Sequence, residues 1–316
     1  MNEMILSVSP HVRSGRTTRK IMGDVLIALC PVTIASWVLF GFRAPLVEAV
    51  CVIAAVASEW VFEKGCKKPV TISDLSAAVT GLLLGLSLPV GIPIWQAVVG
   101  SVAAIVVVKQ LFGGIGHNFA NPAVTARVIM FLAFSSTMAT WAAPNFVAVA
   151  VPGVDAVSTA TPLATLKDVS TEGMNALNLF LGTMGGCLGE TSALALLIGG
   201  VYLLIRKVIS WYTPVAFIGT VFVLALLRGG FVFAGMEVLT GGLILSAIFM
   251  ATDYATTPFT PAGKLIFGVG CGLITCVIRF FGSYPEGASF SILLMNIATP
   301  YICRWTESKP LGGAKA

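Results

Sequence analysis

Charged side chains are scarce in this sequence. Asp, Glu, Lys and Arg make up 10% of its 316 residues, and 57% of the residues are hydrophobic. Soluble domains usually carry about 25% charged residues, because their surfaces face water. A bilayer instead accepts apolar side chains and requires that the backbone be hydrogen-bonded internally. The composition therefore excludes an ordinary soluble enzyme and predicts a membrane protein.

Closely spaced cysteines are also missing. None of the seven cysteines forms a C-x-x-C pair, and most lie in apolar runs. We therefore expect no zinc or iron–sulfur site and no other metal site within this chain. The net charge of +5 does not indicate nucleic-acid binding, because the basic residues cluster at the ends of hydrophobic segments. The lipid bilayer is the partner that this pattern predicts.

Long apolar runs without strand-like alternation predict an all-α polytopic membrane protein. A spanning helix needs about 20 apolar residues, and fewer if neighbouring helices shield a half-length one. Residues 1–20 are polar and have no apolar core, so we expect the first membrane helix, rather than a cleavable signal, to direct insertion. About ten spans are predicted, at 21–42, 45–62, 74–89, 93–112, 122–138, 188–206, 212–227, 235–252, 264–281 and 286–303.

The Lys and Arg residues predict the orientation of these spans. With the N-terminus placed in the cytoplasm, fourteen of the nineteen lie on the cytoplasmic side, Lys109 among them. Three lie outside and two within spans. This excess follows the positive-inside rule. It places both termini in the cytoplasm and the one long connection, 139–187, on the outer face.

Five spans on each side of that connection predict two halves of opposite topology. We divide the chain into an N-terminal five-helix repeat (1–138), an outer-face loop (139–187) and a C-terminal five-helix repeat with a cytoplasmic tail (188–316). Two short echoes support the division: Thr80-Gly81 is similar to Thr240-Gly241, and Lys109-Gln-Leu-Phe-Gly to Arg279-Phe-Phe-Gly. Gly-rich segments at matching positions of inverted halves point to a binding site near the midplane.

The outer loop contains a hydroxyl-rich stretch opened by an acid, from Asp155 to Thr165. Ser, Thr and Pro cluster in many ordinary polar loops, and that interpretation requires no function. The alternative is that a Thr hydroxyl here accepts a covalent modification, with small neighbours giving a modifying enzyme access. Residue chemistry alone does not identify the group as a flavin.

The pattern D-x-x-S-x-A-T in this stretch resembles the flavinylation motif of the family that contains the D subunit of the Rnf complex and the B subunit of the sodium-pumping NADH:quinone oxidoreductase. The resemblance implies that Thr161 carries FMN through a phosphoester, with Asp155, Ser158 and Ala160 as recognition context. Thr159 departs from the family, which usually has Gly there. Further stretches that resemble the Rnf D subunit, in chain order, are Ser9-Pro-His11, Phe112–Ala123, Gly189–Ser192, Ala251–Asp253, Tyr284–Gly287 and Leu294–Asn296.

The resemblance implies a membrane subunit that passes electrons through covalent FMN between reduced ferredoxin and NAD, coupled to Na⁺ or H⁺ translocation. It implies a bacterial cytoplasmic (inner) membrane location, with the flavin on the outer face. The implied partners are a flavin transferase, a second covalently flavinylated subunit and iron–sulfur subunits. The chain has no Gly-rich nucleotide fingerprint after a strand, so we assign it no catalytic residue and expect no activity from it alone. Whether riboflavin is also bound noncovalently is left open.

Two other functions agree with the same topology. One is the quinone-reducing B-type subunit, which shares the cofactor. The other is a urea-transporter-like channel without a redox role, since fold alone does not fix function. The Thr motif favours the redox subunit, because a solute permease would not need it.

Ionisable residues within spans are costly in hydrocarbon and are therefore candidates for function. We select Arg127, Glu190 and Asp253, each beside small residues, for a second flavin site or an ion path. The remaining ionisable side chains are expected to be structural: Asp24 as the cap of the first helix, and Glu237 and Arg279 as groups that extend to an interface.

Overall fold

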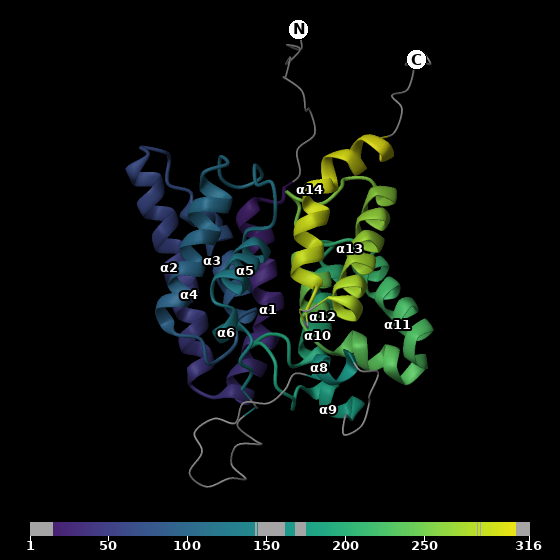
Figure 1. Cartoon of the computed structure of the whole chain (residues 1–316). Helices are drawn as coiled ribbons and strands as arrows, with labels where there is room; N and C mark the ends of the chain where they lie inside the picture. The colour runs from purple at the N-terminus through teal and green to yellow at the C-terminus, as the bar shows by residue number, and fades with distance from the viewer. Residues whose placement is uncertain are drawn as a thin grey trace, which may run out of the picture.

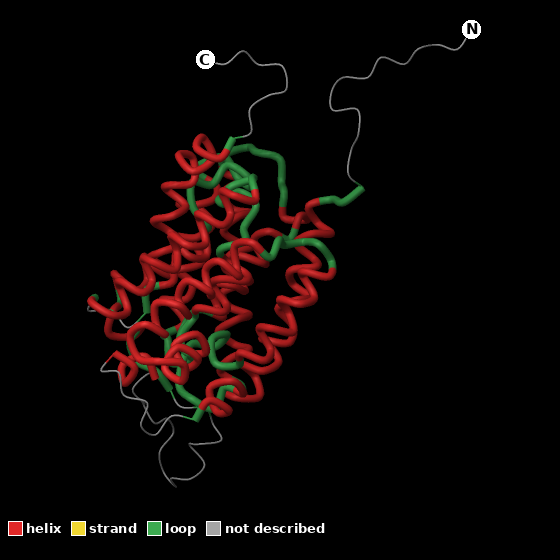
Figure 2. Tube along the Cα trace, turned by 90° about the vertical axis from the view of Figure 1, so that its right-hand side faces the viewer, coloured by secondary structure: helices red, strands yellow, loops and turns green. Residues whose placement is uncertain are grey.

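The structure, a computed structural model, describes residues 15–142, 144, 162–167, 175–282, 284 and 286–307. Every element that these residues form is helical, as predicted (Figure 2). The first part of the chain forms α1 (Thr18–Phe40), α2 (Arg43–Gly65), η1 (Ile72–Asp74), α3 (Ser76–Leu86), α4 (Ile94–Val102), η2 (Ala103–Gln110), α5 (Pro122–Ala133) and α6 (Ser135–Met138). The second part forms α8 (Pro162–Lys167), α9 (Ala176–Leu181), α10 (Ala193–Ile205), α11 (Tyr212–Leu239), α12 (Leu243–Leu245), η3 (Ser246–Met250), α13 (Pro261–Phe281) and α14 (Ala288–Thr306).

Four of these helices, α1, α2, α11 and α13, are long and apolar enough to cross a membrane. The helices α3, α5 and α10 and the continuous pair α4–η2 are apolar but shorter. Large hydrophobic side chains such as Ile53, Leu227 and Phe281 are exposed on the outer faces of the bundle. Exposed apolar surface of this extent is typical of contact with lipid or with a partner protein. These are the features of a polytopic membrane protein, and the count of ten spans stays a prediction.

The greatest difference from the predicted spans lies in 212–252. Two full spans were expected there, at 212–227 and 235–252, but α11 continues through Leu239. The chain turns at Gly230, whose φ of 82° is in the left-handed region that glycine adopts without steric cost. Only the eight residues from Leu243 to Met250 remain for the next helix. The eighth predicted span is therefore a half-length helix.

The helices form two groups in chain order, α1–α6 and α10–α14, which stand side by side (Figure 1). In the first group α2 packs against α3 and α4, and in the second α13 packs against α11 and α14. Contacts of α1 with α10 and of α5 with α14 join the two groups.

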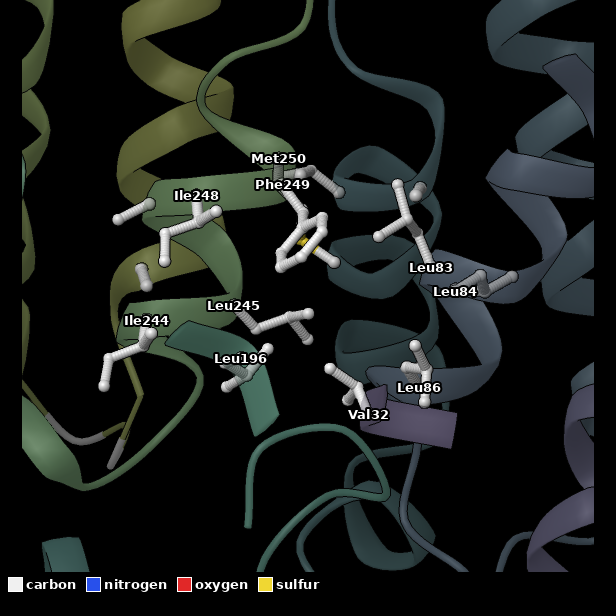
Figure 3. Close-up of a cluster of buried hydrophobic side chains, with 14 of the residues drawn as sticks. Val32, Leu83, Leu84, Leu86, Leu196, Ile244, Leu245, Ile248, Phe249 and Met250 are labelled. Carbon is white, nitrogen blue, oxygen red and sulfur yellow. The ribbon is translucent and has the colours of Figure 1, made fainter. Parts of the chain in front are cut away.

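Two short helices, α3 and the α12–η3 pair, lie at the centre between the groups. All eight residues of α12–η3 are buried, as expected for a helix that is apolar on every side. α3 approaches α2 so closely that a Cβ on Gly81 would lie 2.8 Å from the Cys51 carbonyl oxygen. Side chains from both groups meet here and fill the centre, as Figure 3 shows for Val32, Leu83, Leu84, Leu86, Leu196, Ile244, Leu245, Ile248, Phe249 and Met250.

Asp24 does not cap the first helix, contrary to our prediction. Thr17 is the N-cap of α1, and its side chain accepts a hydrogen bond from the backbone N–H of Lys20. Asp24 lies further along α1 and forms an ion pair with Arg206 at 3.2 Å. It also accepts a hydrogen bond from the Tyr202 hydroxyl at 3.1 Å. Asp24 therefore joins α1 to the end of α10.

Candidate functional site

The predicted flavin-attachment residues Asp155, Ser158, Ala160 and Thr161 lie outside the described residues. The chain immediately after them is described, because α8 begins at Pro162, the residue that follows Thr161. α8 is therefore the described element nearest in sequence to these predicted residues.

α8 is anchored to the second group of helices (Figure 1). The Leu166 side chain is buried in a hydrophobic cluster with Phe233 of α11. The Lys167 ammonium donates a hydrogen bond to the Gly282 carbonyl at 2.7 Å. The Arg228 guanidinium donates to the Lys167 carbonyl at 2.9 Å. Apolar packing and two hydrogen bonds therefore fix α8 against α11 and the end of α13.

At the other end of α8, Leu163 is buried against the turn that precedes α12. A Cβ on Gly241 would lie 2.6 Å from Leu163 Cδ1 and 2.8 Å from Arg279 Nη2. Gly241 also has a φ of 71°, which favours glycine. Leu163, Glu190, Thr191 and Gly241 are among the residues that line a cavity of about 20 Å³, which is room for about one water. The segment after Thr161 therefore contacts a turn that only glycine fits.

A buried charge cluster lies directly behind this turn, and we call Arg127, Glu190 and Glu286 the central cluster. Arg127 of α5 forms an ion pair with Glu286, which precedes α14, and lies 3.8 Å from the carboxylate of Glu190, which precedes α10. The Gly242 backbone N–H donates to Glu286 at 3.0 Å. The Arg127 guanidinium also donates to the Cys187 sulfur at 3.3 Å. The central cluster thus joins segments of both groups at their interface.

The central cluster carries more negative than positive groups. Two carboxylates share one guanidinium, and all three side chains are at least nine-tenths buried. Arg127 Nη1 and Glu190 Oε2 have no hydrogen-bond partner among the described residues. Buried charges are stable only when they are paired and hydrogen-bonded. The cluster therefore has a donor and an acceptor with which to hold a water, a proton or a small polar group.

Glu237 and Arg279 do not extend to an interface, so our prediction for both was wrong. Each is at most 3% exposed, and the two side chains form an ion pair at 3.3 Å between α11 and α13. The Arg279 guanidinium also donates to the backbone carbonyls of Glu237, at 2.8 Å, and Thr240, at 3.2 Å. The two terminal nitrogens of the guanidinium therefore find acceptors inside the protein, while Nε has none among the described residues.

Lys109, which the charge distribution placed on the cytoplasmic side, is also buried inside the protein. It is 2% exposed and forms an ion pair with Glu59 at 2.5 Å, between η2 and α2. The ammonium also donates to the Ser76 hydroxyl at 2.6 Å, at the start of α3. Gln110 donates to the same Glu59 carboxylate at 2.7 Å. Each group of helices therefore contains one buried cation–carboxylate pair beside the start of its central short helix.

The third predicted candidate, Asp253, lies apart from Arg127 and Glu190, in a cavity of about 90 Å³. Its carboxylate accepts a hydrogen bond from the Thr256 hydroxyl at 3.2 Å. Lys109 and Asn118 also line this cavity. Sites for drug-sized ligands measure about 300–1,000 Å³, so the cavity is too small for a flavin ring and has room for waters or a small ion.

Sequence reasoning missed Glu286 as a member of the site. The residue appeared in the stretch Tyr284–Gly287 as part of a family resemblance, but a single acid in a loop gives no sign of a partner 159 positions away. The available signal was its position at the start of the last predicted span, where an ionisable residue is costly in hydrocarbon.

Comparison with known proteins gives one family and a set of similar chains. The model of the NQR2, RnfD, RnfE family matches residues 5–312. The chain is 48% identical to the D subunit of the Na(+)-translocating ferredoxin:NAD(+) oxidoreductase complex of Acetobacterium woodii, over 100% of this chain and 98% of that protein. It is 41% identical to the D subunit of the proton-translocating ferredoxin:NAD(+) oxidoreductase complex of Clostridium ljungdahlii, over 98% and 97%. It is 35% identical to the D subunit of the ion-translocating oxidoreductase complex of Halorhodospira halophila, over 99% and 96%.

Proposed function

The chain belongs to the NQR2, RnfD, RnfE family, and on that premise we propose that it is the D subunit of an ion-translocating ferredoxin:NAD⁺ oxidoreductase complex of the Rnf type. In this proposal it carries electrons through FMN bound covalently to Thr161. The observation that carries the proposal is the anchoring of α8, which begins one residue after Thr161 and packs beside the central cluster.

Covalent FMN supplies a group that accepts electrons in one- or two-electron steps. The residues of this chain hold in place the helix that follows the attachment residue. Leu163 and Leu166 hold α8 by burial, and Lys167 and Arg228 hold its end by hydrogen bonds. Covalent attachment also keeps the flavin at a high local concentration, because a tether replaces reversible binding.

The finer topology is part of the same proposal. We infer two inverted five-helix repeats with about ten spans, both termini in the cytoplasm and the Thr161 loop on the outer face of the bacterial cytoplasmic membrane. The matching ion pairs Glu59–Lys109 and Glu237–Arg279 support the repeat, as do the two central short helices.

The partners follow from membership of such a complex. We infer contacts with the other subunits, including a second covalently flavinylated subunit and iron–sulfur subunits, and transient contact with a flavin transferase. The names of two relatives differ in the ion, sodium in one and proton in the other. The choice of ion is therefore not a consequence of the fold that they share.

A urea-transporter-like channel is the less supported function. In the part of the chain that the structure describes, apolar side chains fill the centre between the two groups of helices (Figure 3). A solute path would need a polar lining there. The quinone-reducing B-type role differs from the proposal in the electron acceptor, and a quinone-reductase assay on the purified complex separates the two.

In-gel flavin fluorescence tests the attachment site. The full-length chain is expressed with its complex partners and flavin transferase, denatured and resolved by electrophoresis. We expect wild type to fluoresce, Thr161→Val to be dark and Thr165→Val, the matched control within α8, to fluoresce as wild type does. A dark wild-type band, or a fluorescent Thr161→Val band, contradicts covalent FMN at Thr161 and makes solute-flux assays the next experiment.

A further inference from the structure

An apolar groove runs along the outer surface between α10 and α11. Its volume is about 410 Å³, within the size range of ligand sites. We call it the α10–α11 groove. One wall is a face of α10, one is a face of α11, and Ile248 of η3 lies at the floor. Its lining residues are Leu197, Gly200, Val201, Leu204, Ile209, Pro214, Val215, Ile218, Gly219, Phe222, Val238 and Ile248.

The groove exists because its two walls pack elsewhere. α10 packs chiefly against α1, and α11 against α13. Gly200 lets α10 lie close to the floor, since a Cβ there would lie 2.9 Å from Ile248 Cδ1. Gly219 leaves the α11 wall open, because a Cβ there would meet no atom within 4 Å. The space is therefore a property of the packing of both helices.

The shape of the groove suits a narrow apolar chain. After the turn at Gly230, α11 returns so that Val238 also lines the groove. A protein helix with its side chains is about 10–12 Å wide, which is wide for a space of about 410 Å³. A lipid acyl chain is thinner and flexible, and it gains free energy with each buried methylene group.

Basic and aromatic residues mark one end of the groove. Lys207 lies in the turn between Leu204 and Ile209, which both line the groove. Lys207 is exposed, and no described acidic residue forms an ion pair with it. Trp211 and Tyr212 follow, with their rings stacked at 4.4 Å. Lys beside Trp and Tyr is typical of the level of the lipid headgroups.

We propose that the α10–α11 groove binds one acyl chain of an anionic phospholipid, whose phosphate lies at Lys207. Charge complementarity selects the headgroup, and the volume of the groove favours a chain over a helix. The lipid would fill the space between α10 and α11 and so connect α10, which packs on the first group of helices, to α11 in the second. This site is independent of the flavin.

Native mass spectrometry tests the proposal. The full-length chain is stripped of lipid in detergent and titrated with phosphatidylglycerol or with phosphatidylcholine of the same acyl chains. We expect wild type to bind phosphatidylglycerol about fivefold more tightly, as one lysine near a phosphate predicts. Gly219→Leu fills the groove and is expected to weaken both lipids by about tenfold or more, because it removes contacts with several methylene groups.

Matched variants separate the groove from general effects. Gly235→Leu places the same side chain on the same helix, also in open space but outside the groove lining, and is expected to bind both lipids as wild type does. Lys207→Gln is expected to remove the preference for phosphatidylglycerol, because the two headgroups differ in net charge and the lysine is what distinguishes them. Lys264→Gln, at the start of α13, is expected to keep the preference. Because Lys207 is exposed, its substitution should not impair folding. The test of headgroup preference therefore remains valid even if Gly219→Leu lowers the yield of folded protein.

Two results would overturn the proposal. One is equal binding of both lipids by wild type with no effect of Gly219→Leu. The other is a purified complex in which Gly219→Leu releases a partner subunit while lipid binding by the chain is unchanged, which would assign the groove to a partner's helix.

Discussion

The two groups of helices use the same kind of buried ion pair in different surroundings. In the first group Lys109 places one ammonium between the Glu59 carboxylate and the Ser76 hydroxyl. In the second, Arg279 bonds a carboxylate and two backbone carbonyls at once. Lys is a point donor with three protons, whereas the guanidinium is a planar fork that fits several acceptors.

The two pairs also differ in their distance from α8, the helix that follows the proposed attachment residue Thr161. Arg279 fixes the main chain from Glu237 to Thr240, and the next residue, Gly241, contacts Leu163 of α8. The pair in the first group is not in contact with α8 among the described residues. We therefore expect a break in the first pair to lower stability alone, and a break in the second to disturb α8 as well.

The largest effect is expected from Arg279→Met. The substitution leaves the Glu237 carboxylate buried without a partner, which costs about 3–5 kcal/mol, and releases two carbonyls next to α8. We expect a large fall in the thermal stability of the purified complex and a loss of flavin reduction by ferredoxin. Differential scanning fluorimetry and stopped-flow absorbance measure the two effects.

Lys109→Met is the matched comparison for this experiment. It should destabilise by a similar amount, because Glu59 is fully buried, but the flavin in the remaining folded complex should be reduced at the wild-type rate. Equal loss of flavin reduction in both variants would contradict the expectation that only the Arg279 pair influences α8. The double variant Arg279→Met with Glu237→Leu should recover part of the stability, since no uncompensated charge remains.

A smaller effect is expected from Gly241→Ala. The methyl group would lie 2.6 Å from Leu163 Cδ1 at a backbone φ of 71°. Overpacking of this kind costs about 1–3 kcal/mol and must displace either α8 or Arg279. We expect lower stability together with slower covalent flavin attachment, measured as in-gel fluorescence against time.

Gly219→Ala is the control, because the added methyl group at that position of α11 meets open space. It should attach flavin at the wild-type rate. If Gly241→Ala did so too, the contact between Leu163 and the turn would have no part in presenting Thr161.

The next effect concerns the charge of the central cluster. Glu190→Gln removes a negative group near α8. The removal of this charge should stabilise the reduced flavin and so raise the flavin's reduction potential. We expect a rise on the order of tens of millivolts, because charges inside a protein interact at an effective dielectric constant of about 20 rather than 80. Redox titration of the flavin absorbance in the complex measures it.

Glu307→Gln removes the same charge at the far end of α14 and should leave the potential unchanged. A potential that moves equally in both variants, or in neither, would show that the central cluster lies too far from the flavin to influence it.

Much of the fold could be predicted from hydropathy and charge. The apolar runs predicted helices in the correct order, and the third, predicted at 74–89, is observed as the shorter buried helix α3. The similarity of Lys109-Gln-Leu-Phe-Gly to Arg279-Phe-Phe-Gly was informative, because both cations occupy buried pairs at the end of a helix. The similarity of Thr80-Gly81 to Thr240-Gly241 was not, since the first lies inside α3 and the second before α12.

The remaining features depend on contacts that a linear pattern does not contain. Arg279 was expected at an interface because a hydropathy window covers only neighbouring residues. Its hydrogen-bond acceptors lie 39 and 42 residues away in the sequence. Glu286 and Arg127 are 159 residues apart. The turn at Gly230 falls in the predicted connection between 212–227 and 235–252, whereas the interruption between Leu239 and Leu243 was not predicted, because both sides of it are apolar. The predicted flavin residues lie outside the described part of the chain, so they stay a prediction.

The smallest effect is expected where an ion pair is open to solvent. The side chain of Arg206 is 54% exposed, while that of its partner Asp24 is 14% exposed. Exposed pairs contribute about 1 kcal/mol or less, because water screens them and two side chains must be ordered. Asp24→Asn should therefore lower stability only slightly, and adding salt should reduce its difference from wild type. The loss of stability in Arg279→Met should persist in salt, because that pair is shielded from ions. Thermal unfolding of both variants at low and high salt makes the comparison. A large, salt-independent loss in Asp24→Asn would show that the contact between α1 and α10 depends on this pair as strongly as each group of helices depends on its buried one.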